Sequence, residues 1–67
     1  MASPMKDKNY DLISVVYHAA QGSELCRQYI EDAQNEGADD LAQFFKEVQE
    51  QNQQLVEKGK ELLKNKL

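Results

Sequence analysis

The sequence predicts an all-α protein, an antiparallel hairpin of two helices that dimerises into a four-helix bundle. Two halves of the chain each carry a ladder of mostly apolar side chains at alternating steps of four and three residues, and Gly37 lies between them. This spacing is typical of helices that meet along a coiled-coil-like seam. A bend at Gly37 pairs the ladders in reverse order. Their members are Leu12, Val16, Ala19, Ser23, Cys26, Ile30 and Ala33, then Leu41, Phe45, Val48, Asn52, Leu55, Gly59 and Leu62.

The first predicted helix covers residues 9–35, after a loose lead-in at residues 1–8. Pro4 disfavours helix at the residue before it, and Asn9 or Asp7 can cap the helix start. A glycine that follows the last turn of a helix commonly adopts a left-handed conformation. We therefore expect the helix to stop at a turn formed by residues 36–38, with Gly37 as its left-handed residue.

The second predicted helix covers residues 39–65. Asp39 and Asp40 stand at its start, where acidic side chains complement the helix dipole. Gly22 and Gly59 fall inside the two helices, where each glycine costs about 1 kcal/mol relative to alanine. We expect close approach of another helix to compensate, with Gly59 facing Val16 across the hairpin.

The apolar stripes are wider than a two-helix seam requires. An apolar surface left uncovered in this way marks an interaction site. A second copy of the chain would cover it and complete the bundle, although a different protein is an alternative partner. The predicted dimer interface comprises Ile13, Val15, Ala20, Gly22, Tyr29, Phe44, Val56 and Leu63.

One layer of the seam is polar, because Ser23 pairs with Asn52, and Cys26 and Gln51 are expected nearby. A polar layer inside a bundle can fix the register of the helices, since a buried amide must find partners. Alternatively it can form a site, as in bundles that hold metals between facing helices. Hydroxyl, amide and thiol groups favour the first role here.

A resemblance to a known family rests on residues 22–29, Glu36-Gly37, Leu41-Ala42 and Phe44-Phe45. Over about residues 18 to 60 the chain resembles the first helical pair of the ferritin-like superfamily, especially rubrerythrin-like proteins. The resemblance implies a half-ferritin that dimerises. Family members bind two irons through a glutamate on the first helix and a Glu-x-x-His motif on the second. The corresponding positions are Ala19, Asn52 and Leu55, or Gln51 and Gln54 after a shift of one residue, and none of these side chains suits iron.

Four other side chains could form an improvised metal site on the surface, and they define the alternative function of an iron-binding or redox protein. They are His18, Glu24, Glu47 and Glu50. Glu47 and Glu50 are three residues apart and share a helix face. The alternative interpretation is that these four side chains belong to an ordinary solvated surface, in which case the protein holds no cofactor.

Composition limits the remaining function classes. The formal charge of −4, from 12 acidic and 8 basic side chains, disfavours binding to nucleic acid or to an anionic membrane. The only cysteine, Cys26, falls on the seam and predicts a packed thiol rather than a nucleophile. The sequence contains neither a signal-peptide pattern nor a membrane-spanning run. We therefore expect a cytoplasmic, non-enzymatic homodimer that acts as a scaffold or protein-interaction module.

Overall fold

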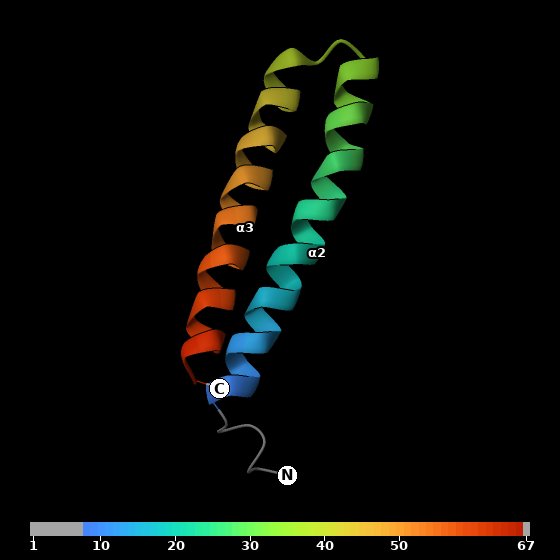
Figure 1. The fold of residues 1–67 in the computed structure, drawn as a ribbon. Coiled ribbons are helices and arrows are strands. Elements are labelled where there is room, and N and C mark those ends of the chain that lie inside the picture. The colour runs from blue at the N-terminus through green and yellow to red at the C-terminus, as the bar shows by residue number, and fades with distance from the viewer. Residues whose placement is uncertain (1–7, 67) are drawn as a thin grey trace.

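The computed structural model describes residues 8–66 and contains two helices, α2 (Lys8–Asn35) and α3 (Asp39–Lys66), packed against each other. Figure 1 shows that they run in opposite directions, so the start of α2 and the end of α3 lie at the same end of the hairpin. The predicted helices are one residue shorter at these outer ends. Residues 1–7 of the predicted lead-in lie outside the described residues, whereas Lys8 is the first residue of α2.

The connection between the helices is a Schellman motif centred on Gly37. The amide of Ala38 donates to the carbonyl of Ala33 at 2.8 Å, and the amide of Gly37 donates to the carbonyl of Gln34 at 3.0 Å. Gly37 has a φ of 72°, the left-handed conformation that this motif requires. The predicted role of Gly37 is confirmed. The motif satisfies carbonyl groups that the end of α2 would otherwise leave without partners.

We expect Gly37→Ala to destabilise the hairpin by about 1–2 kcal/mol, because an L-residue is strained at positive φ. A Cβ at Gly37 would meet no heavy atom within 4 Å, so the cost comes from the backbone alone. Gly37→Asn is the matched control, because asparagine tolerates this conformation better. Urea denaturation followed by circular dichroism measures both variants. Equal losses for alanine and asparagine would contradict the conformational explanation.

The helix starts show how local sequence sets the boundaries. Asp39 and Asp40 lie in the first turn of α3, and the carboxylate of Asp40 accepts a hydrogen bond of 2.8 Å from the amide of Leu41. The carbonyl of Ala38 accepts the bond from Ala42 at 3.0 Å. At the start of α2, Asn9 lies inside the helix and is therefore not its cap, whereas Asp7, the other predicted cap, lies outside the described residues.

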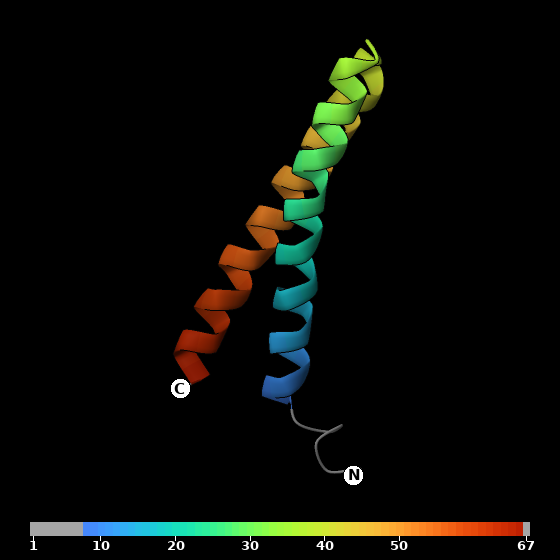
Figure 2. The ribbon, with the colours of Figure 1, turned by 90° about the vertical axis from the view of Figure 1, so that its right-hand side faces the viewer.

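The hairpin is a single layer of helices. It measures 48 × 25 × 13 Å between Cα atoms, and its thinnest dimension is close to the diameter of one helix. Figures 1 and 2 together show that α2 and α3 cross at an angle rather than running strictly parallel. A hydrophobic core forms between two packed layers, and one hairpin supplies only one of them.

The register of the hairpin agrees with the predicted pairing of Val16 and Gly59. A Cβ placed on Gly59 would overlap Cγ2 of Val16 and lie 3.8 Å from Cδ1 of Leu12. The backbone of α3 therefore approaches the side chains of α2 at this level, and any residue with a Cβ would force Val16 to move. The expectation that close helix approach accompanies the interior glycine is confirmed at this position.

Candidate interaction surface

Small residues make the contact between the two helices. The most buried apolar side chains are Ala19, Cys26, Ala33 and Ala42, and no large side chain of the described residues is fully buried. Gly59 is also buried. Small side chains let two helices approach closely, and this approach leaves little room for a leucine or phenylalanine between them. The hairpin therefore keeps its larger apolar groups at the edges of the contact or outside it.

The observed ladder of the second helix differs from the predicted one at four positions, Leu41, Val48, Leu55 and Leu62. Val48 is half-buried, but the next residue, Gln49, makes the hydrogen bond to α2. Leu41, Leu55 and Leu62 are 49%, 52% and 45% exposed. The residues that follow them in sequence face α2 instead: Ala42 is buried, and Val56 and Leu63 are half-buried. The observed ladder is Ala42, Phe45, Gln49, Asn52, Val56, Gly59 and Leu63. The observed ladder shares three members with the predicted one. Both ladders have the same alternating steps of four and three residues, so spacing alone cannot distinguish them.

This rotation of α3 creates a second stripe of large side chains. Its members recur every seven residues, which places them on one line along a helix that supercoils: Leu41, Val48, Leu55 and Leu62. On α2 the same interval links Val15, Gly22 and Tyr29, three residues of the predicted dimer interface. We call these seven residues the apolar face. The repeat at seven residues was the signal in the sequence that could have identified its α3 half.

The remaining residues of the predicted interface lie elsewhere. Ile13 and Ala20 are exposed on the opposite flank of α2. Phe44 is 56% exposed and lies beside the apolar face, further from α2. Val56 and Leu63 belong to the contact within the hairpin and are correspondingly half-buried.

Two shallow hollows lie on the apolar face, one near each end of the hairpin. The hollow near the turn has a volume of about 240 Å³ and is lined by Tyr29, Asp32, Ala33, Glu36, Leu41 and Phe45. The hollow near the open end has a volume of about 170 Å³ and is lined by Leu12, Val15, Val16, Leu55, Lys58, Gly59 and Leu62. Acidic groups border the first hollow, and a lysine borders the second.

One aromatic pair joins the two helices near the turn, and a second pair lies within α3 beside it. The centroid of the Tyr29 ring lies 5.6 Å from that of Phe45, and the Phe44 ring lies 5.9 Å from Phe45. These separations and tilted orientations are within the favourable range for aromatic pairs. Phe45 is half-buried and therefore links α3 to α2, as the predicted ladder expects.

The polar layer involves Gln49 as well as Asn52. The side-chain amide of Gln49 donates to the backbone carbonyl of Ser23 at 3.1 Å. Asn52 is half-buried, and its Nδ2 atom lies 2.8 Å from where a Cβ of Gly22 would stand. Gln51, which was expected near this layer, is exposed. Polar contacts across the seam therefore lie at the level of Gly22 and Ser23, where they can fix the register.

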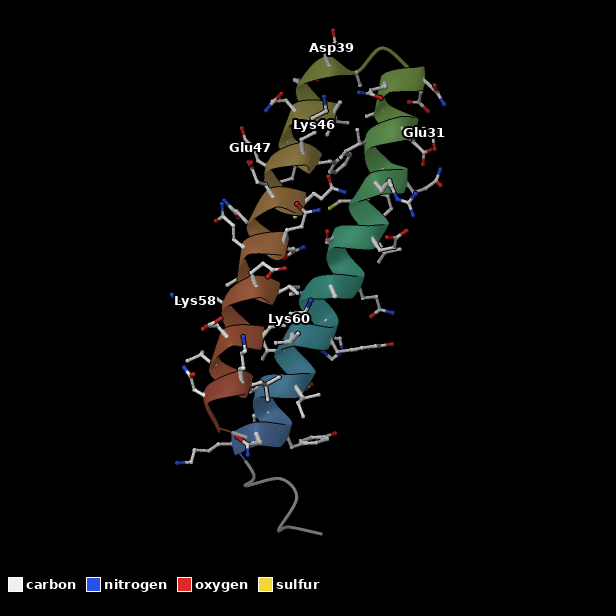
Figure 3. The ribbon with its side chains drawn as sticks, viewed as in Figure 1. Glu31, Asp39, Lys46, Glu47, Lys58 and Lys60 are labelled. Carbon is white, nitrogen blue, oxygen red and sulfur yellow. The ribbon has the colours of Figure 1, made fainter. Side chains whose placement is uncertain are left out.

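The flank of the hairpin opposite the apolar face is mostly polar, although Ile13 and Ala20 are exposed on it. Figure 3 shows Lys46 and Lys60 on the side toward the viewer, with Lys60 over the boundary between the helices. Arg27, on the same flank of α2, donates a hydrogen bond to Glu24, and this bond and the charge of Glu24 raise the pKa of Arg27. Because both side chains are largely exposed, the ion pair contributes little to stability. Charged side chains are therefore more frequent on this flank than on the apolar face.

The structure does not assemble the predicted metal candidates into a site. Among residues 8–66 no group of three or more histidine, cysteine, aspartate and glutamate side chains could hold an ion. The Nδ1 atom of His18 lies 2.9 Å from the carbonyl of Ser14, and Glu24 pairs with Arg27. Figure 3 shows Glu47 pointing away from α2, and Glu50 is exposed.

Neither α2 nor α3, within residues 8–66, has a stretch long and apolar enough to cross a membrane. Comparisons with protein-family models, with curated proteins and with solved structures found no match. The resemblance to ferritin-like proteins therefore stays a prediction, and the functional conclusion rests on the surface of the hairpin itself.

Proposed function

We propose that the chain works as a non-enzymatic homodimer, a four-helix bundle in which two hairpins meet through their apolar faces and serve as a scaffold or protein-interaction module. The observation that carries the proposal is the exposure of the large apolar side chains. Within residues 8–66, ten of them are at least 44% exposed, while the buried apolar side chains are all alanine or cysteine. Three of the ten, Leu41, Leu55 and Leu62, form one stripe on α3.

The energetics favour this arrangement. Full burial of a leucine, valine or phenylalanine side chain stabilises a protein by about 1.5–3 kcal/mol. A chain of 67 residues has few such side chains to enclose by itself, and small scaffolds without disulfides or metals commonly gain stability by association. Cys26, the only cysteine, is free. A second hairpin would add the second layer that a helical core needs.

Analytical ultracentrifugation between about 1 and 100 µM tests the proposal directly. We expect a mass twice that of one chain at the upper concentrations and a melting temperature that rises with concentration, because association stabilises the folded state by mass action. A folded single chain at 100 µM, with a melting temperature independent of concentration, would refute the homodimer.

Leu55→Glu locates the interface. In one hairpin the side chain is 52% exposed, so its replacement costs little by itself, whereas a glutamate buried between two hairpins would lack a partner. We expect the dimer dissociation constant to rise at least about 30-fold, the effect of losing a residue worth 2 kcal/mol at an interface. Gln54→Glu is the matched control, because it adds the same charge at the neighbouring exposed position outside the apolar face. Equal effects would mean that charge, not location, causes the loss.

A further inference from the structure

Resting on the homodimer proposed above, we infer that its two hairpins pack in opposite directions, with the turn of each beside the open end of the other. The two-fold axis runs across the helices at the level of Gly22 and Asn52. Self-complementarity of the apolar face and the distribution of charge along it both favour this orientation over one with the turns at the same end.

The stripe on α3 maps onto itself under such an axis. Leu41 and Leu62, and likewise Val48 and Leu55, are equally far from the midpoint between Gln51 and Asn52. The axis therefore brings Leu41 against Leu62 of the second copy, and Val48 against Leu55 of the second copy. A two-fold interface requires this kind of self-matching surface.

The stripe on α2 has the same centre. Val15 and Tyr29 lie seven residues either side of Gly22. The position of a Gly22 Cβ is 2.8 Å from Nδ2 of Asn52, so the midpoints of the two stripes lie at one level of the hairpin. A single axis can consequently serve both helices.

Opposite charges at the two ends of the α2 stripe also favour opposite packing. The seven-residue interval continues outward to Lys8 and Glu36, both exposed. Opposite packing places Lys8 against Glu36 of the second copy and repeats this pair by symmetry. Packing with the turns together instead places Glu36 beside the apolar side chain of Leu41 of the second copy.

The two ends of the hairpin also differ in net charge, and this difference favours opposite packing. The turn end is strongly acidic, with Glu31, Asp32, Glu36, Asp39, Asp40 and Glu47 against the single base Lys46 within residues 28–47. Within residues 8–19 and 56–66 the open end has five lysines, Lys8, Lys58, Lys60, Lys64 and Lys66, against Asp11, Glu57 and Glu61, so its net charge is weakly positive. Opposite packing sets unlike ends together, whereas the alternative sets two acidic ends together. Opposite packing also brings Asp11 near Asp32 of the second copy, but both side chains are exposed, so solvent and salt screen their repulsion.

Electron–electron distance measurement between spin labels tests the orientation. The label is placed at Asn35→Cys, an exposed position near the turn, in a Cys26→Ala background that removes the native thiol. At 1.5 Å per residue, each label lies about 20 Å along the helix from the level of Gly22, so opposite packing separates the two labels by about 40 Å. Turns at the same end would separate them by about 20 Å, the width of two helices.

A dimer whose labels are about 20 Å apart would overturn the orientation while leaving the homodimer intact. A monomer by ultracentrifugation, with no dipolar signal, would overturn both proposals. The control is the melting temperature of the unlabelled Cys26→Ala chain. A value within a few degrees of the wild type shows that this substitution preserves the fold.

Charge reversal provides an independent readout. Lys8→Glu and Glu36→Lys should each raise the dissociation constant several-fold, because each places like charges together twice in its own homodimer. An equimolar mixture of the two variants restores both unlike pairs, so it should form heterodimers with close to wild-type affinity. The expected result is this recovery on mixing at low salt and its decline at high salt. A mixture no tighter than the separate variants would overturn the orientation.

Discussion

Phe45→Ala is expected to unfold most of the protein at 25 °C. Phe45 is the half-buried ring that contacts Tyr29 across the hairpin and Phe44 along α3. Truncation of a buried phenylalanine costs about 3–5 kcal/mol. The lower end applies here because the ring is partly exposed, and about 3 kcal/mol is a large share of the stability of so small a domain. Circular dichroism should show loss of the helical signal and a much lower melting temperature.

Phe44→Ala is the control for this prediction. Its ring is 56% exposed and lies 5.9 Å from Phe45, so it belongs to the same aromatic group but does not link the helices. We expect a loss smaller than about 1 kcal/mol, in line with exposed substitutions. If the two alanine variants melted at the same temperature, Phe45 would not be the contact that holds the turn end together.

Gly59→Ala is expected to destabilise the hairpin by about 1–2 kcal/mol. The new methyl group would overlap Cγ2 of Val16, a β-branched side chain with little rotamer freedom in a helix. Overpacking of this kind costs about 1–3 kcal/mol, and the better helix propensity of alanine returns up to about 1 kcal/mol. Urea denaturation at several protein concentrations measures the loss and separates it from any change in association.

A double-mutant cycle with Val16→Ala identifies the cause of that loss. Val16→Ala alone removes packing, but in combination with Gly59→Ala it also removes the overlap. We expect the double variant to be more stable than the sum of the single effects predicts, with a coupling of at least about 1 kcal/mol. Strictly additive losses would mean that Gly59 is not in contact with Val16.

The register could be predicted from the sequence where a residue has only one acceptable environment. Gly37 is the residue best suited to a left-handed turn, and the structure gives it that conformation. Gly59 inside a helix required a close neighbour, and Val16 is there. Each conclusion follows from the absence of a Cβ, a property that does not depend on the rest of the fold.

The composition of the apolar face could be predicted only in part. Val15 and Tyr29 were expected outside the seam and are exposed, and Gly22 lies at its edge beside Asn52, but Leu41, Leu55 and Leu62 were assigned to the seam and are exposed. The predicted and the observed ladder on α3 have the same spacing, and hydrophobicity favours the predicted ladder because it contains more leucine. Packing at close range selected the ladder that contains Ala42 and Gly59 instead.

The sequence by itself determined that there are two helices and that they reverse at Gly37, because local propensity and the special conformations of glycine act within a few residues. It also placed Val16 opposite Gly59, because the position of the turn fixes how the two ladders pair. Only the tertiary structure decided which side of α3 faces α2. That choice depends on how closely two backbones can approach, and small side chains such as Ala33 and Ala42 permit an approach that leucines would prevent. The exposed stripe of leucines on α3 is the consequence of that choice.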